Sequence, residues 1–219
     1  MAKIDEGILG PSSGKVGEVI GSSWHGIPYI KSRPAVFHDA KSPAQLAQRM
    51  RMQAAHGFVK SVKIYAEIGF RMVSGNQTPY NRAVSCIMKQ AIVGEYPTLY
   101  IEPSKVVLSQ GKLAGAEESL ATKEKGKKIC FSWSMNSSSA QNGRTDEIDV
   151  LDGLEDDTAW LIAYNFTKQE VKALQANRKD QKGVLEYSSR WKGDNIGCYI
   201  FFASNETDDT SNSQFLGTI

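Results

Sequence analysis

One stretch of the chain has the glycine and lysine content of a phosphate-binding loop. Residues 10–16 read Gly-Pro-Ser-Ser-Gly-Lys-Val, whereas a phosphate loop requires G-x-x-x-x-G-K-[ST] between a buried strand and a helix. Leu9 stands where the first glycine belongs, Val16 replaces the hydroxyl that would hold magnesium, and β-prone residues follow in place of a helix. We therefore expect no nucleotide site, and we interpret the glycines as bends in a strand or hairpin.

Histidine is the side chain most suited to acid–base chemistry near neutral pH. The chain has His25, His38 and His56, and none has a partner at metal-ligand spacing such as i, i+4 on a helix. No G-x-S-x-G or cysteine–histidine pattern accompanies them. The sequence therefore predicts no catalytic residue, no metal site and no cofactor, and we expect that the protein is not an enzyme.

Carboxylates are dense near residue 150, where seven Asp and Glu residues occur between positions 146 and 157. Calcium loops alternate oxygen ligands around a tight glycine turn. The segment Asp149-Val-Leu-Asp152-Gly153 lacks the D-x-D-x-D-G order. A solvated acidic loop, facing basic residues of a neighbouring subunit, is the favoured interpretation.

Basic residues are concentrated in the first half of the chain. Residues 1–110 hold 13 Lys and Arg against 7 Asp and Glu, and residues 111–219 hold 13 against 17. Four side chains on or beside one expected helix could neutralise phosphates: Arg49, Arg51, Lys60 and Lys63. No recognition-helix motif or RNA-binding aromatic block accompanies them. Nucleic-acid binding is thus a less favoured hypothesis than head-to-tail association between copies of the chain.

The N-terminal segment is rich in glycine. Six glycines occur in residues 7–34 between valine, isoleucine and tyrosine, which predicts a β-hairpin with strands over about residues 15–20 and 27–32 and a turn over 21–26. An exposed β-prone edge is a template for strand addition, so we expect contacts with other copies. The expected contact residues are Gly10, Gly14, Lys15, Val16, Gly17, Val19, Trp24, Tyr29 and Arg33.

Two helices are expected next, and each begins with a cap residue followed by a proline. Ser42 and Pro43 begin the first, which should end at Gly69, and Thr78 and Pro79 begin the second, which should end before Gly94. Neither can bury its apolar stripe alone. We therefore predict one unit over residues 1–95, in which both helices pack on the hairpin.

After Tyr96-Pro97 the pattern changes to short strands separated by turns. We expect strands near residues 105–109, 128–134, 158–165, 183–188, 196–203 and 214–219, a less regular one within 113–120, and a possible short helix within 167–177. This spacing predicts an antiparallel β-sandwich over residues 96–219. The predicted fold class is therefore α+β: a glycine-rich hairpin with two helices, followed by the sandwich.

Targeting signals and a disulfide framework are not evident. No run approaches the roughly 18 apolar residues that span a bilayer, and Asp5 and Glu6 stand where a signal peptide is apolar. Cys86, Cys130 and Cys198 are too few for a framework. Buried thiols are the simplest interpretation, with a Cys130–Cys198 bridge left open. The cellular location is left unknown.

Two resemblances to known families complete the picture. The segments 128–133, 159–164, 198–204 and 211–213 resemble strands B, C, F and G of fibronectin type III or immunoglobulin-like modules, which keep a Trp on B and a Tyr on F in the core. The sequence also resembles an uncharacterised family of Bacteroidota proteins, through its G-x-x-x-G-K-V-G block at Gly10–Gly17 and its Gln-x-x-x-R segment at Gln45–Arg49. Both resemblances imply architecture and no chemistry.

These observations favour a non-enzymatic structural protein that self-assembles, such as a phage-like virion component or a filament subunit, with the N-terminal segment making the subunit contacts. The partners expected are other copies or other structural subunits, with no membrane span. The alternative is a binding module that uses the sandwich loops for a protein or glycan partner. Nucleic-acid binding through the basic half is a third hypothesis.

Overall fold

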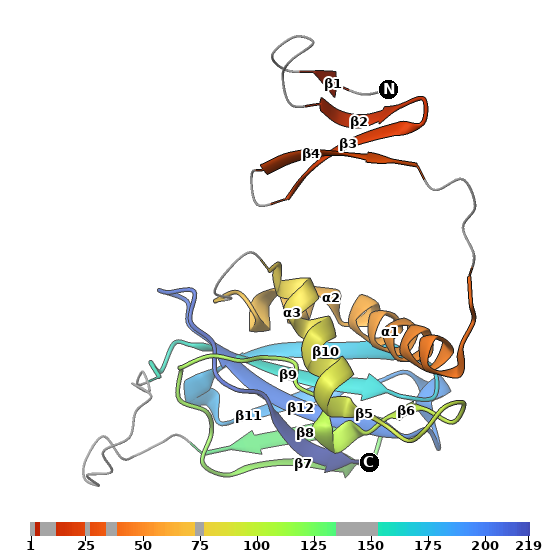
Figure 1. The fold of residues 1–219 in the computed structure, drawn as a ribbon. Coiled ribbons are helices and arrows are strands. Elements are labelled where there is room, and N and C mark those ends of the chain that lie inside the picture. Colours follow the sequence, from red (N-terminus) through yellow and green to blue (C-terminus); the bar gives the residue numbers. More distant parts are fainter. Residues whose placement is uncertain (1–2, 5–11, 25–26, 34–38, 73–76, 135–152) are drawn as a thin grey trace, which may run out of the picture. The chain divides into compact units, whose positions relative to one another are not determined.

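The computed structural model describes residues 3–4, 12–24, 27–33, 39–72, 77–134 and 153–219 (Figure 1). The chain forms two compact units, residues 1–42 and 43–219. This boundary differs from the expected division into 1–95 and 96–219. The reason lies in the helices, whose apolar stripes pack on a β-sheet built from residues beyond 96.

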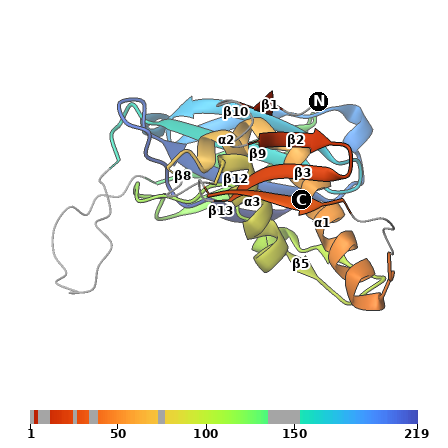
Figure 2. The same cartoon turned by 45° about the horizontal axis from the view of Figure 1, so that its top comes forward.

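The first unit is an antiparallel sheet of four strands in the order β1-β2-β3-β4; all four are labelled in Figure 1, and Figure 2 shows β1, β2 and β3 from another direction. The strands are β1 (Lys3–Ile4), β2 (Ser12–Val16), β3 (Val19–Trp24) and β4 (Ile27–Ser32). The prediction of a continuous strand over residues 15–20 is wrong, because Val16 pairs with Val19 across a turn. Gly17 supplies the turn with a φ of +56°, which glycine adopts without steric cost.

The second unit begins with three helices, α1 (Pro43–Ser61), α2 (Lys63–Gly69) and α3 (Pro79–Cys86), the last continued by a π-helical turn over Ile87–Ala91. The predicted starts at Pro43 and Pro79 are confirmed. The Thr78 side chain accepts a hydrogen bond of 3.2 Å from the Asn81 amide, as a helix cap should. The single helix expected as far as Gly69 is interrupted at Val62, where φ is −105° and ψ is 17°.

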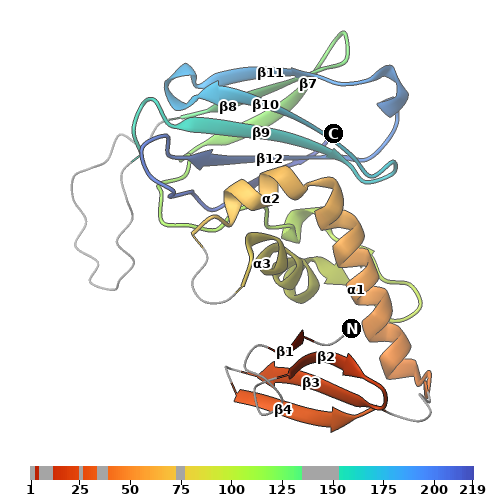
Figure 3. The ribbon, with the colours of Figure 1, turned by 90° about the horizontal axis from the view of Figure 1, so that it is seen from above.

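Two antiparallel sheets follow, confirming the α+β class (Figure 3). The first has the order β10-β9-β12-β13 and the second β11-β8-β7, and β5 pairs with β6 separately. The strands are β5 (Ile92–Val93), β6 (Tyr100–Ile101), β7 (Ser119–Glu124), β8 (Lys128–Trp133), β9 (Thr158–Asn165), β10 (Glu170–Asn177), β11 (Lys182–Glu186), β12 (Ile196–Ala203) and β13 (Gln214–Thr218). The 3-10 turns lie at Pro103–Lys105, Arg178–Asp180 and Ser189–Trp191.

Three sequence predictions about these elements are wrong. Residues 105–109 form no strand, because a 3-10 turn and irregular chain occupy them. Of residues 113–120, only the last two enter β7, and Leu113 makes an isolated bridge to Ser211. The possible helix within 167–177 is strand β10, because all eight residues of that strand pair with β9. Pairing with a neighbouring strand therefore overrides the helical spacing of Val171 and Leu174.

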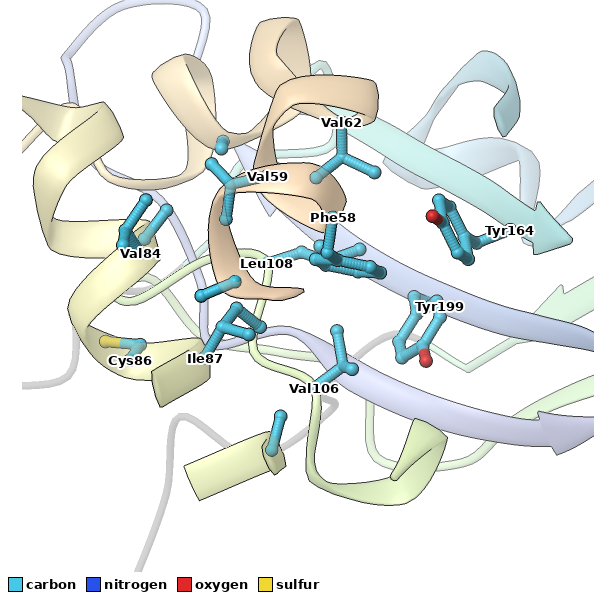
Figure 4. Close-up of a cluster of buried hydrophobic side chains, with 14 of the residues drawn as sticks. Phe58, Val59, Val62, Val84, Cys86, Ile87, Val106, Leu108, Tyr164 and Tyr199 are labelled. Carbon is cyan, nitrogen blue, oxygen red and sulfur yellow. The ribbon is translucent and has the colours of Figure 1, made fainter. Parts of the chain in front are cut away.

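The β10-β9-β12-β13 sheet is buried on both faces, so the second unit has three layers. On one face, Tyr164 and Tyr199 join the core beneath the helices (Figure 4). On the other face, Ile200 and Phe202 join a second core shared with the three-stranded sheet. Every residue of β12 is accordingly buried.

The cysteines and two expected core aromatics can now be placed. Cys86, Cys130 and Cys198 are all buried and free, so the bridge left open between the last two is not formed. Trp133 is buried between the two sheets, where its ring contacts Phe202. Tyr199 is also buried, but it lies on the helix side, and its hydroxyl donates to the Pro103 carbonyl at 2.8 Å.

Candidate functional site

The N-terminal sheet exposes apolar side chains on both faces. Cross-strand partners share a face and successive residues alternate between faces. Gly14, Gly21 and Ile30 are partners in register and therefore lie on one face, together with Val16 and Val19. Val16, Val19 and Ile30 are 60%, 45% and 69% exposed. This face therefore carries three large aliphatic side chains beside two glycines that have none.

The opposite face has a mixed apolar and basic character. Lys15, Ile20 and Lys31 are partners in register, and Ile27 and Tyr29 follow on the same side. Ile27 is 63% and Tyr29 41% exposed. The Lys31 ammonium lies 6.0 Å from the centre of the Tyr29 ring, a cation–π distance. This face could contact a partner surface that is apolar with acidic groups.

The burial of the sheet's side chains is described for residues 13–23 and 27–33. Among these residues Gly21 is buried, and no large apolar side chain is. Stable domains bury an apolar sheet face against a second layer. The exposed apolar side chains of this sheet are therefore available to a covering surface.

The free edge of the sheet is less suited to contacts than its faces. β4 has a neighbour on one side only in the sheet order, but it carries Pro28 and Lys31. Proline cannot donate to a β-ladder, and edge lysines oppose pairing with another chain. Strand addition along β4 would therefore form an incomplete ladder.

The structure brings most of the predicted contact residues together. Gly14, Lys15, Val16, Gly17, Val19 and Tyr29 lie in β2–β4 or in the turn between them, Trp24 ends β3, and Arg33 follows β4 with its amide donating to the Glu18 carbonyl at 2.7 Å. Gly10 lies outside the described residues. Ile27 and Ile30 were not among the predicted contacts, although their positions in an alternating strand next to Tyr29 were the available signal.

The predicted basic surface is divided. Arg49, Arg51 and Lys60 lie on α1, and Lys63 on α2 forms an exposed ion pair of 3.6 Å with Glu67. At about 100° per residue, Arg49 and Lys60 are roughly 20° apart around the helix, whereas Arg51 is roughly 200° from Arg49. The three side chains on α1 therefore do not form a single stripe that could follow a phosphate backbone.

Arg51 instead lines a groove of about 620 Å³ between α1 and α3. Met52, Met88 and Lys89 also line it, as does His56, whose Nδ1 lies 3.1 Å from the Tyr80 hydroxyl. The groove therefore combines methionine side chains with basic ones.

The other candidate residues show no site in the described part of the chain. His25, His38 and residues 146–152 of the acidic run lie outside it. At the end of that run, Asp157 is buried and lies 3.8 Å from Arg178, and Asp156 forms an exposed ion pair with Lys179. Burial raises the pKa of the Asp157 carboxyl, partly offset by the Leu154 amide and by Arg178. The Asp157 carboxylate is therefore part of the packed interior, whereas that of Asp156 is solvated.

Two negative findings are likewise limited to the residues that the structure describes. They contain no group of three or more His, Cys, Asp or Glu side chains that could hold a metal ion. Among their helices, none has both the length and the apolar character needed to cross a bilayer. Strand β2 contains Gly14, Lys15 and Val16. No helix begins after Lys15, as a phosphate loop would require, so the phosphate-loop geometry is absent at these residues.

Comparison with known proteins places the chain in a family. No match was found among curated proteins or among solved structures. A family model described as "Family of unknown function (DUF6266)" matches residues 11–217, which include strands β2–β4 of the N-terminal sheet and all but the last two residues of the second unit. The chain therefore belongs to the DUF6266 family of unknown function.

Proposed function

We propose that this protein is a non-enzymatic structural subunit that self-assembles, as in a virion component or a filament, and that its N-terminal sheet makes the subunit contacts. One observation carries the proposal: the sheet presents exposed apolar side chains on both faces. Val16, Val19 and Ile30 lie on one face, and Ile27 and Tyr29 on the other. Clustered exposure of this kind is typical of surfaces that bind other proteins.

The size of the apolar surface limits the strength of one contact. A large apolar side chain contributes roughly 1.5–3 kcal/mol when fully buried, and these five are about half exposed. Covering them would therefore contribute on the order of 5 kcal/mol, and association itself costs at least a comparable amount. A single contact is weak on this estimate, so assembly requires several contacts in each particle.

Two apolar faces also favour a repeating arrangement. The faces differ, because one has a pair of glycines and the other two lysines. When unlike surfaces bind between copies, the contacts close into a ring or propagate as a filament. This geometry supports a filament or shell subunit more than a simple symmetric dimer.

A pair of isoleucine substitutions tests the proposal. Ile30 on β4 and Ile64 on α2 are 69% and 66% exposed, so Ile30→Asp and Ile64→Asp introduce the same charge at equally solvated positions. We expect Ile30→Asp, like deletion of residues 1–42, to shift the purified protein to monomer in light scattering. Ile64→Asp should assemble as the unmodified chain does. Assembly that survives both changes in the N-terminal unit would refute the mechanism.

We further infer that residues 119–218 form a fibronectin type III or immunoglobulin-like sandwich. The sheet order supports this: β7, β8 and β11 correspond to strands A, B and E, and β9, β12 and β13 to C, F and G, with β10 added beside C. The helix layer is an addition to such a module, since a sandwich leaves its outer faces to solvent. An experimental structure of the second unit tests the strand assignment.

The likeness to Bacteroidota proteins rests on the Gly10–Gly17 block and the Gln45–Arg49 segment.

A further inference from the structure

We propose that a polar hollow at one end of the β10-β9-β12-β13 sheet binds a neutral carbohydrate. The hollow has a volume of about 550 Å³, within the range of small-ligand sites. Three segments line it: the C-terminal end of α2 with Ile68 and the chain just after it with Arg71, the cross-strand neighbours Trp160 and Gln175, and the loop over residues 204–208. This inference does not depend on the proposed assembly, because all of these residues belong to the second unit.

The loop that forms one wall is held by its own hydrogen bonds. The Ser204 hydroxyl accepts from the amides of Glu206 at 3.3 Å and Thr207 at 3.2 Å. The Asn205 side chain accepts from the Thr158 hydroxyl at 2.8 Å and donates to the Asp156 carbonyl. A loop fixed in this way has already lost most of the conformational freedom that a ligand would otherwise have to remove.

The charged groups in the hollow select a neutral ligand. Arg71 Nη1 lies 3.0 Å from Asp208 Oδ1, and the two side chains are 44% and 66% exposed. Glu206 and Asp208 both line the hollow, so an anion would meet two like charges and a single arginine that is already paired with Asp208. A hydroxyl group can both accept from the guanidinium and donate to a carboxylate, so a polyhydroxyl ligand satisfies both partners of the pair.

Trp160 is a half-buried aromatic side chain that lines the hollow. Its indole lies nearly parallel to the Phe201 ring, at 15° and 6.3 Å between centroids, and contacts the Tyr65 ring at 65° and 5.7 Å. These two rings fix its orientation. A pyranose has C–H groups on its faces and hydroxyls around its rim, so it can pack against the indole. Gln175, the partner of Trp160 in register, can then donate to and accept from the rim.

Saturation-transfer NMR on the full chain tests this site, with free glucose, galactose, mannose and N-acetylglucosamine as probes at millimolar concentration. We expect at least one of these sugars to receive saturation and to change the tryptophan fluorescence. Arg71→Gln and Asp208→Asn should each weaken that sugar by about 10- to 100-fold, the effect of losing a hydrogen bond to a charged group.

A second exposed ion pair provides the matched control. Lys128 and Glu186 lie 3.2 Å apart with exposures of 43% and 73%, close to those of Arg71 and Asp208. Exposed pairs contribute little to folding, so all four variants should fold, and Lys128→Gln and Glu186→Gln should bind sugar as before. The proposal is overturned if no sugar of the panel receives saturation, if inorganic phosphate binds in its place, or if the control pair weakens binding as much as the Arg71 pair.

Discussion

Two ion pairs that are adjacent in sequence differ completely in burial, and they allow a direct test of what holds the second unit together. Arg178 is 3% exposed. Its guanidinium donates to the carbonyls of Ala114 at 2.9 Å and Gly115 at 3.1 Å, and it lies 3.8 Å from the Asp157 carboxylate. It also lies 4.4 Å from the centre of the Phe202 ring. The neighbouring pair, Lys179 and Asp156, is solvated.

Replacing Arg178 with methionine keeps the length of the side chain and removes every one of these interactions. The Ala114 and Gly115 carbonyls would then lose their donor and the buried Asp157 carboxylate its counter-charge, and removing one partner of a buried pair typically costs about 3–5 kcal/mol. Lys179→Met breaks an ion pair of 2.9 Å whose side chains are 49% and 81% exposed, a loss of about 0–1 kcal/mol.

Urea unfolding measures the difference. With an m-value of roughly 3 kcal/mol/M, the midpoint should fall by about 1–1.7 M for Arg178→Met and by less than about 0.3 M for Lys179→Met. Trp133 is a local reporter, because its indole N–H donates to the Arg178 carbonyl at 2.8 Å. Adding Asp157→Asn to Arg178→Met should cost less than the two single changes summed, since the uncompensated carboxylate is removed. Equal midpoint shifts for the two methionine variants would refute this account of the core.

Three further outcomes are expected. Gly69→Ala should destabilise the protein, because an added Cβ would lie 2.8 Å from the Ser109 Cβ and closer still to the Leu108 carbonyl oxygen. At Gly57 an added Cβ meets nothing within 4 Å, so Gly57→Ala should stabilise helix α1 by up to about 1 kcal/mol. Thermal unfolding measures both changes. Burial raises the pKa of Cys198 to about 12, so this thiol should react with a thiol reagent only after denaturation; rapid native labelling would contradict its placement. Hydrogen bonds from Lys168 and Asn165 lower the pKa of the Asp194 carboxyl. The contribution of Asp194 to folding stability is therefore present above the ordinary carboxyl pKa of about 4 and is lost as the pH falls through the lowered value. The difference in melting temperature between the unmodified chain and Asp194→Asn should therefore shrink on acidification, and a constant difference would argue against this linkage.

Local sequence signals determined the starts of helices α1 and α3 and the positions of the central strands. Thr78 and Pro79 specify a helix start through a side-chain cap and a fixed φ, and no distant residue is needed. Strands β9 and β12 have the predicted bounds, because both are rich in β-branched and aromatic residues and are bounded by turn residues. The unbroken apolar run of β12 was also a signal that both faces of its sheet are covered.

The sheet pairings could not be obtained in this way. The spacing of Val171 and Leu174 fits a helix as well as a strand, and eight pairs with β9 decide the outcome. In the N-terminal unit, the turn at Gly17 sets which residues share a face, and a shift of register exchanges the faces. Sequence patterns therefore identified the segment expected to make contacts but not the face on which each side chain lies.

The sequence by itself determined what each short segment prefers, namely the capped helices, the β-prone runs and the glycine bends, because these preferences depend on neighbours within a few residues. Tertiary structure alone decided which distant residues meet. It placed Asp157 beside Arg178, assembled the hollow beside Trp160 from three separate segments, and set which layer covers each face of the β10-β9-β12-β13 sheet. Burial and electrostatic environment depend on residues that are distant in sequence, and only the folded chain brings them together.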